Sequence, residues 1–507
     1  MPSPLPFALR PRAGGVARAA AAAALAGLLA SCGGGGSDAG SDPFGNGLPD
    51  ADSLAQECAM PRPGDRPGSL ATEKAWLRSW IDETYLWYQD VRALPPGTLD
   101  PANSATPLEY FEKLKSPLIT PSGKAKDEFH FTYPTPEWIA LSQSGISYGY
   151  GFQVAMIDDT TPDRVAIVAF VEPGSPAAAA GIARGTAIVD VDGANVADGA
   201  ADVLNAGLHP KAAGDHSFVV RDLGAGSDRS ITLTAAPLVA TPVLKVATLP
   251  APNQSVGYLL FNDHVATSER QLVAAIDTLK AAAVTDLVLD VRYNGGGYLD
   301  IAAELAYMIA GPGQTSGKFF ERMNYNNRDP FNQSRSERTT PFLNVTQGFS
   351  GGPSGQSLPY LGLARVFVLA GGDTCSASEA IVNGLRGAGV TVHLIGSTTC
   401  GKPYGFYPQD NCGTTYFAIQ FQGVNFLGFG DYADGFAPTC SVADDFSHEL
   451  GDPAENQLEV ALGLRSTGMC TAPTSLRAQP LGIGRRGGSG PVLTRTPERE
   501  NRIYRQR

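Results

Sequence analysis

The chain has 507 residues and a hydrophobic fraction of 43%, which is enough apolar material for the cores of several domains. Its composition is that of a globular protein. The formal net charge of −12 argues against nucleic acid as the main partner, because binding to a phosphate backbone relies on clustered lysine and arginine.

Residues 1–32 have the order of features found in a secretory signal. Three arginines near the start precede an alanine- and leucine-rich core from Ala19 to Ala30, which is too short to span a bilayer stably. The core ends in Leu29-Ala30-Ser31-Cys32, which resembles the lipobox of bacterial lipoproteins, where the cysteine is lipidated. Ordinary cleavage near the same site is the alternative.

Residues 33–56 are rich in Gly, Ser, Asp and Pro, which is the composition of a flexible linker. A lipidated Cys32 would therefore hold the mature protein on a membrane through a tether. The lipobox resemblance implies the bacterial cell envelope, with the protein facing the periplasm and the outer membrane as the expected anchoring site.

Residues 57–140 are predicted to form a small helical domain. A helix over Ala71 to Asp90 is expected from the mostly helical spacing of its aromatic residues, Trp76, Trp80, Trp87 and Tyr88. Such a stripe is more typical of a core than of a binding surface. We therefore assign this domain to packing rather than to chemistry.

Residues 141–240 change to short β-strand patterns punctuated by glycine and proline, such as VAIVAFV over 165–171. The order of these patterns resembles a PDZ domain. The resemblance implies a loop that receives the terminal carboxylate of a peptide while the peptide adds as an extra strand. Its residues are Gly149, Tyr150, Gly151 and Phe152. A small β domain that only packs on its neighbour is the alternative.

Residues 241–470 alternate strand and helix patterns, as α/β sheets do. Val256 to Phe261 and Asp286 to Val291 are predicted strands, with a helix starting at Ser268 between them. The second strand leads to Asn294 and three glycines. Because glycines at a strand end let a substrate backbone approach closely, the N–H of Gly295 or Gly296 is a candidate oxyanion donor.

A serine lies at a later strand-to-helix turn. The apolar run from Val366 to Ala370 predicts a buried strand, and a helix opens at Ser376. A helix N-terminus favours negative charge, so Ser376 is a candidate nucleophile with the Ala377 N–H as an oxyanion donor. The alternative is a structural N-cap, in which Glu379 completes a capping box.

A lysine follows that serine by 26 residues. A second apolar run from Thr391 to Gly396 predicts a parallel strand that carries Gly401 and Lys402 to the same region. A serine hydroxyl needs a nearby base, and burial would lower the pKa of a lysine toward the working pH. Lys402 also completes a G-x-x-x-x-G-K pattern, but Pro403 stands where a phosphate-binding loop needs Ser or Thr, which disfavours nucleotide binding.

Three motifs in this order resemble the C-terminal processing peptidases, also called tail-specific proteases. They are D-V-R-Y-N-G-G-G (290–297), T-C-S-A-S-E (374–379) and the Gly401-Lys402 pair. The resemblance implies an α/β fold with a crotonase-like catalytic core, and a serine endopeptidase that uses a Ser376–Lys402 dyad and no cofactor. Its substrates would be proteins or peptides with free C-termini, selected through the PDZ domain.

One position departs from the family pattern. Many members carry a glutamine four residues after the lysine that helps to orient it, whereas this chain has Phe406, with Gln409 as the nearest substitute. Ser378 and Glu379 are possible supporting residues around Ser376, although helix capping explains them equally well. A catalytically silent scaffold that binds protein C-termini through its PDZ domain is the alternative function.

The six histidines form no compact ligand motif, so no metal is expected and a metalloprotease is disfavoured. The sequence also has no G-x-S-x-G motif, which argues against an α/β-hydrolase triad. His264 and His393 remain open as partners of Ser376 in a Ser-His-acid arrangement.

Cysteine use fits an oxidising compartment. If Cys32 is lipidated, the six other cysteines allow fifteen full pairings, and the local pairs Cys400–Cys412 and Cys440–Cys470 are the first expectation. Residues 471–507 contain eight arginines and no sustained apolar period. This tail is predicted to be disordered, either solvated or touching anionic lipid headgroups.

Overall fold

The computed structural model describes residues 47–158, 161–474, 492–493 and 502–504. The predicted signal, Cys32 and most of the predicted linker lie outside these residues. Within them, none of the helices has the length and apolar character needed to cross a membrane.

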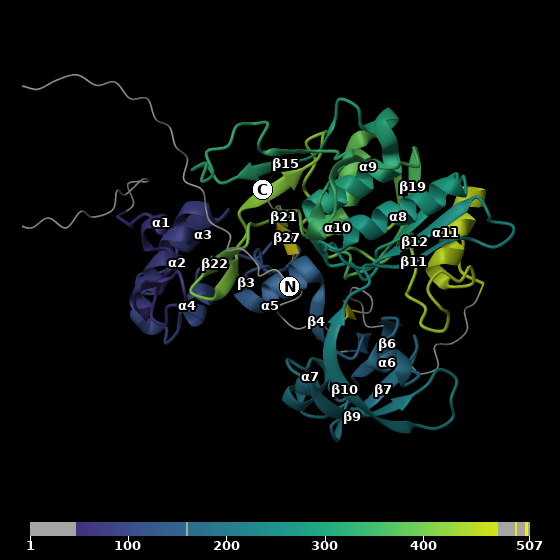
Figure 1. The fold of residues 1–507 in the computed structure, drawn as a ribbon, viewed down its shortest axis with the longest axis horizontal. Coiled ribbons are helices and arrows are strands. Elements are labelled where there is room, and N and C mark those ends of the chain that lie inside the picture. Colours follow the sequence, from purple (N-terminus) through teal and green to yellow (C-terminus); the bar gives the residue numbers. More distant parts are fainter. Residues whose placement is uncertain (1–46, 159–160, 475–491, 494–501, 505–507) are drawn as a thin grey trace, which may run out of the picture. The chain divides into compact units, whose positions relative to one another are not determined.

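The central sheet follows the predicted α/β alternation (Figure 1). Its order is β11-β12-β13-β19-β20-β25, and every neighbouring pair is parallel except β11 with β12. The bounds are β11 (Val243–Thr248), β12 (Val256–Phe261), β13 (Asp286–Asp290), β19 (Arg365–Ala370), β20 (Thr391–Gly396) and β25 (Cys440–Ser441). The predicted strands around Val256, Asp286, Val366 and Thr391 are therefore confirmed.

Both faces of this sheet are buried. Successive side chains of a strand point to opposite faces, so Leu287 and Leu289 join one hydrophobic core while Val288 joins the other. The first core is shared with α8 (Ser268–Ala281), α9 (Leu299–Thr315) and α10 (Ala377–Ala388), and the second with α11 (Asn456–Thr467). Coverage of both faces explains why these strands are continuous apolar runs in the sequence.

The N-terminal region contains helices and short strands, and its main helix is shorter than expected. The helix predicted to reach Asp90 ends at Thr84, because the chain leaves the helical path at Tyr85 and the Leu86 N–H donates to the Ile419 carbonyl at 2.8 Å. Trp76 and Trp80 are buried and stacked on each other, as core residues. The helices are α1 (Ala51–Leu54), α2 (Leu70–Thr84), α3 (Tyr88–Arg92), α4 (Pro107–Lys113) and α5 (Thr135–Ser144).

The PDZ-like region forms a second sheet with its own core. The predicted strands are present, together with one helix, α7, that the sequence did not suggest. The bounds are β4 (Ile146–Gly149), β5 (Phe152–Asp158), β6 (Val165–Val171), α6 (Pro176–Ala179), β7 (Ala187–Val191), β8 (Ala194–Asn195), α7 (Ala201–Leu208), β9 (Gly214–Arg221) and β10 (Arg229–Val239).

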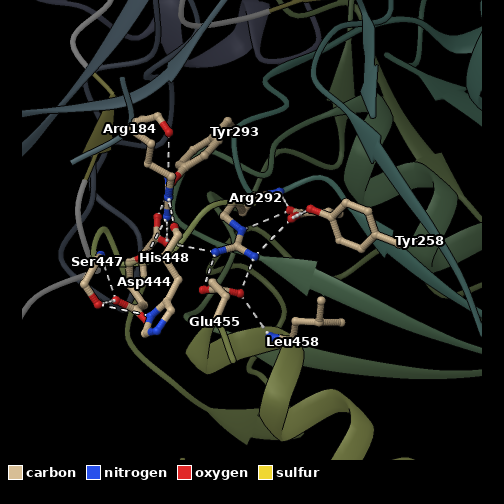
Figure 2. Close-up of polar contacts among 12 residues, drawn as sticks. Arg184, Tyr258, Arg292, Tyr293, Asp444, Ser447, His448, Glu455 and Leu458 are labelled. Atoms are coloured by element: carbon tan, nitrogen blue, oxygen red, sulfur yellow. Dashed lines mark hydrogen bonds and ion pairs between the residues drawn. The ribbon is translucent and has the colours of Figure 1, made fainter. Parts of the chain in front are cut away.

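A buried ionic network joins this region to the central sheet (Figure 2). Arg184 Nη2 lies 2.7 Å from Asp444 Oδ1, and Arg292 Nη1 lies 2.8 Å from the same oxygen. Arg292 also pairs with Asp290 and Glu455. Burial alone would raise the pKa of Asp444, but the two guanidinium groups lower it to about 2. The network fixes the segment that leads from β13 to the glycines.

Short strands complete the described fold. β3 (Phe131–Pro134), β22 (Gln409–Asn411) and β23 (Thr414–Phe417) form one sheet, and β15 (Phe319–Tyr325), β16 (Thr339–Pro341), β21 (Tyr404–Gly405) and β24 (Phe421–Val424) form another. The remaining elements are β1 (Glu57–Cys58), β2 (Arg66–Pro67), β14 (Gly296–Tyr298), β17 (Val345–Gln347), β18 (Ser354–Ser357), η1 (Pro101–Asn103) and η2 (Phe349–Gly351).

The tail contains two strands where disorder was predicted. β26 (Val492–Leu493) pairs with β5, and β27 (Arg502–Tyr504) pairs with β14. The prediction of disorder was wrong at these five residues. The edge of a strand can pair with any backbone, so the added segment needs no apolar pattern of its own. The other residues of the tail beyond Thr474 lie outside the described residues.

Three disulfides connect the six cysteines that follow Cys32 in the sequence. Cys440–Cys470 is confirmed, whereas Cys400–Cys412 is wrong. Cys412 instead bonds to Cys58, and Cys400 bonds to Cys375. Cys412 lies beside the first strand of the N-terminal region, where its N–H donates to Gln56 Oε1. A partner 354 residues away in the sequence could not be inferred from local spacing.

Candidate active site

The predicted site residues follow the carboxyl ends of four parallel strands. β12 leads to His264, β13 to Gly295, β19 to Ser376 and β20 to Lys402. Because carboxyl ends of parallel strands meet at one edge of a sheet, these segments gather there, as ligand-binding segments do in other α/β sheets.

Ser376 is the N-cap residue of α10, so the predicted strand-to-helix turn is confirmed. Its φ of 63° and ψ of −114° are rare for a residue with a side chain. Such strain costs about 1–3 kcal/mol and is typical of functional sites. The residue has 0% exposed surface, and its N–H donates to Glu379 Oε2 at 3.0 Å, which is one half of the predicted capping box.

Gly296 packs directly against the serine. A Cβ added to Gly296 would lie 2.8 Å from Ser376 Cβ and 2.9 Å from the Ala377 nitrogen, so only glycine fits. The Gly296 N–H donates to Asn294 Oδ1 at 3.0 Å. Of the two predicted donors from this loop, the Gly296 N–H is therefore already used, and the N–H of the half-buried Gly295 is the better candidate beside Ala377.

Asn294 holds this loop onto the start of α10. Its carbonyl accepts hydrogen bonds from the Cys375 N–H at 3.1 Å and from Ser378 Oγ at 3.0 Å. The Ser378 hydroxyl thus ties the glycine loop to the start of α10.

Lys402 has 0% exposed surface and an apolar surrounding. Its Nζ lies 4.4 Å from the centroid of the Phe406 ring and 4.6 Å from that of Phe129. Among the described residues Nζ has no hydrogen-bond partner, and it makes no hydrogen bond to Ser376. Burial lowers the pKa of Lys402 well below its usual value, although Asp127 and Glu379 act in the opposite direction. A lysine in this state can accept a proton.

Phe129 is a site residue that the sequence did not reveal. It belongs to the N-terminal region, which was assigned to packing alone, yet its ring covers the lysine. Phe406 occupies the position at which many family members carry a glutamine, and its ring is the second one that covers the lysine. The predicted substitute is wrong: Gln409 lies on β22, and its side chain donates to the Asp410 carbonyl rather than to Lys402.

Glu379 connects the serine turn to the lysine loop. Its buried carboxylate accepts hydrogen bonds from four groups: the N–H of Ser376 (3.0 Å), the N–H of Gly401 (2.9 Å), the N–H of Lys402 (2.8 Å) and the Thr399 hydroxyl (2.5 Å). Burial raises the pKa of Glu379, while these hydrogen bonds act to lower it. The carboxylate thus holds the backbones of the two predicted catalytic residues without pairing with the lysine ammonium.

A disulfide reinforces the same junction, since Cys375 precedes Ser376 and Cys400 lies two residues before Lys402. Cys375, Glu379 and Cys400 are also the one group of potential metal ligands within 4.8 Å of one another in the described ranges. Because the two sulfurs are bonded to each other, they are not thiolates able to bind a metal.

The two candidate histidines differ in position. His264 Nδ1 lies 2.9 Å from Asn294 Oδ1, next to the glycine loop, and burial lowers the pKa of His264 to about 4. His393 stacks on Phe367, whose side chain belongs to the core under α11 rather than the core under α10. The structure thus removes His393 as a partner of Ser376 and keeps His264 close to the site.

A cleft of about 410 Å³ leads from the PDZ-like sheet to the glycine loop. Its wall contains the predicted carboxylate loop, Gly149 to Phe152, and also Gly295 and Gly296. Gly151 has a φ of +87°, and a Cβ there would lie 2.2 Å from Ser175 Cβ, so the loop requires this glycine. Lys211, just after α7, adds a cation to the wall that the sequence did not single out.

Comparison with known proteins agrees with the order of these parts. Residues 255–406 match the model of peptidase family S41, and residues 139–209 match that of the PDZ domain. A carboxyl-terminal-processing protease of Picosynechococcus sp. is 26% identical over 265 residues, which cover 52% of this chain and 56% of that protein. A chloroplastic C-terminal processing peptidase of Tetradesmus obliquus is 30% identical over 183 residues, which cover 34% of this chain and 38% of that protein.

The matched region thus spans about half the length, or less, of these curated relatives. Among solved structures, an S41 protease from Bacteroides fragilis superposes with a TM-score of 0.58 at 23% identity, covering 78% of this chain and 97% of that one. At this identity the likeness concerns the fold, a mixed α/β architecture with a PDZ domain.

Proposed function

We propose that this chain, which belongs to the C-terminal processing peptidases of family S41, is a serine endopeptidase that cuts proteins selected by their C-terminal ends. Ser376 is the nucleophile and Lys402 its general base. The observation that carries the proposal is the shared Glu379 carboxylate, which holds the backbones of both residues beside a fully buried lysine side chain.

In this mechanism the neutral Lys402 amine takes the proton of the Ser376 hydroxyl as the oxygen attacks the scissile carbonyl. A rotation of either side chain must first bring the two groups into hydrogen-bond contact, because Nζ has no such partner within the described part of the chain. The developing oxyanion is bound by the N–H groups of Ala377 and Gly295, at the N-terminus of α10. We take the core that carries these residues to be crotonase-like.

Substrate selection is assigned to the cleft. The free carboxylate of a protein enters the loop Gly149–Phe152 near Lys211, while the preceding residues pair with β5 as an added strand. The same cleft continues to Gly295, so the polypeptide has a direct path toward the nucleophile.

Hydrolysis of unfolded casein without added nucleotide tests the proposal. We expect Ser376→Ala and Lys402→Arg to abolish it, because the first removes the nucleophile and guanidinium does not deprotonate. Ser466→Ala, an exposed serine at the end of α11, is the matched control and should keep full activity. Loss of the Ser376 cap costs about 1 kcal/mol, so thermal unfolding is measured beside activity.

The alternative is a silent scaffold that binds protein C-termini. It predicts that the unmodified chain binds such peptides and hydrolyses none of them. Full activity of Lys402→Arg would instead keep the peptidase and transfer the base role to His264.

We further propose that Cys32 is lipidated and anchors the protein to a membrane of the bacterial envelope on the periplasmic side. Two acyl chains on one cysteine bury enough CH₂ groups for stable anchoring. Cys32→Ala should move the protein from the membrane pellet to the soluble fraction. Retention of the variant in the pellet would contradict the lipid anchor.

A further inference from the structure

The two strands of the tail pair with the two strands that border the proposed substrate path. β26 (Val492–Leu493) adds to β5 of the PDZ sheet, and β27 (Arg502–Tyr504) adds to β14 beside the nucleophile. These contacts place one segment of the chain at both ends of the cleft.

At the first end, β26 lies where a PDZ ligand would lie. β5 directly follows the loop Gly149–Phe152, and apart from β26 it is an edge of its sheet. The pairing is antiparallel, with Val492 opposite Met156 and Leu493 opposite Ala155. β26 therefore runs toward the carboxylate loop, in the direction and on the edge that an added peptide strand uses.

At the second end, β27 lies beside the catalytic residues. Arg502 is opposite Gly296, the glycine that packs on Ser376. β27 also neighbours β21, which begins two residues after Lys402. Ser376 and Lys402 both have 0% exposed surface in this arrangement. A substrate that paired with β14 would need the position that β27 occupies.

The charge of the tail suits this double contact. The sequence beyond Thr474 has eight arginines against two glutamates, whereas the whole chain has a net charge of −12. The remainder is thus acidic, which favours association with a basic segment.

We propose that the strands β26 and β27 act as an internal ligand, which occupies the substrate path at β5 and at β14 and inhibits the peptidase by competition. The inhibition rests on the proposed function, while the binding does not. Protein substrates must displace the two strands from β5 and β14 before they reach Ser376.

The full chain with Val492→Pro, Leu493→Pro and Ile503→Pro tests the inhibition. Proline cannot donate to a strand ladder, and two adjacent prolines remove the N–H that faces β5 in either register. We expect KM for unfolded casein to fall severalfold with kcat nearly unchanged. Ile483→Pro, which lies in the tail outside both strands, is the matched control and should behave as the unmodified chain. Equal KM for the triple variant and the unmodified chain would overturn the proposal.

A binding measurement separates this proposal from the peptidase assignment. A fluorescent peptide of residues 489–507 is titrated into the inactive Ser376→Ala chain and into the same chain with the three prolines. We expect at least tenfold tighter binding to the second, because its own tail no longer fills the path. Equal or absent binding overturns the internal ligand, whereas tighter binding without casein hydrolysis by any variant supports the ligand and refutes the peptidase.

Discussion

Cys375 and Cys400 form a disulfide that links the residue before Ser376, the proposed nucleophile, to the loop two residues before Lys402, the proposed base. Glu379 holds the same two segments through backbone hydrogen bonds. The relative position of Ser376 and Lys402 therefore depends on one covalent link and on the hydrogen bonds to one carboxylate.

Removal of this disulfide should lower catalysis more than stability alone explains. We expect the Cys375→Ala/Cys400→Ala variant to lose roughly tenfold to a hundredfold in kcat, because small misplacements of catalytic groups have effects of this order. The assay is casein hydrolysis at a temperature where the variant is folded.

Cys440–Cys470 provides the control for that prediction. It closes a loop of similar length, with a sequence separation of 30 against 25, so the entropy lost by the unfolded chain is similar. Cys440→Ala/Cys470→Ala should lower the melting temperature while kcat is kept. Equal kcat values for the two double variants would contradict a specific role of Cys375–Cys400.

The Arg184 network should dominate the attachment of the PDZ domain. Arg184→Met leaves Asp444, Tyr293 and the Ala169 carbonyl without their shared donor. Breaking a buried ion pair from one side costs about 3–5 kcal/mol of unfolding free energy. Arg221→Met is the control, because its pair with Asp228 is exposed and contributes about 0–1 kcal/mol. Denaturant unfolding that ranks the two variants equally would contradict this assignment.

Much of the fold could be predicted because its signals are local. The buried strand before Ser376 and the strand before Gly401 are continuous apolar runs bounded by glycine, and both appear within one or two residues of expectation. The glycine loop and the carboxylate loop could be predicted for the same reason, because each contains a position, Gly296 or Gly151, where only glycine fits.

The parts that could not be predicted depend on contacts between distant segments. Phe129 covers Lys402 although 273 residues separate them, and no local pattern marks such a pair. The strands β26 and β27 are likewise set by the exposed edges of β5 and β14, not by their own sequence. The helix predicted to reach Asp90 ends early because the Leu86 N–H donates a hydrogen bond to the distant Ile419 carbonyl.

The two rings that cover Lys402 should set the pH dependence of the proposed hydrolysis. Burial is the largest influence and lowers the pKa of Lys402, so kcat/KM should rise with pH through that lowered value. Phe129→Ala admits water to the ammonium, which should raise the pKa and shift the rise to higher pH. Loss of the ring also removes a favourable contact with the cation, but this effect is smaller than the relief of burial.

Phe342→Ala is the control for the shift. Phe342 is as buried as Phe129, and its ring packs on Phe320 rather than on Lys402. Its removal leaves a comparable gap away from the two rings that cover the lysine. A profile that moves equally in both variants would show that general loosening, and not exposure of the lysine, causes the change.

The buried lysine should also destabilise the folded chain, and its replacement should reveal by how much. At neutral pH the unfolded chain binds a proton at Lys402 more readily than the folded chain does, because burial depresses the folded-state pKa. Folding stability therefore rises with pH, and the penalty of Lys402 disappears only near the unfolded pKa of about 10.4. Lys402→Met keeps a side chain of similar shape without a charge, so it should abolish hydrolysis. It should also increase the unfolding free energy at pH 7. The increase is about 1.4 kcal/mol for each unit by which burial lowers the pKa of Lys402, counted down to pH 7. The gain should shrink as the pH approaches 10.

Lys280→Met, at an exposed position near the end of α8, is the control and should give no such pH-dependent gain. If Lys402→Met unfolds at the same denaturant concentration as the unmodified chain from pH 7 to pH 10, the lysine is not held in the depressed state that the general-base role requires.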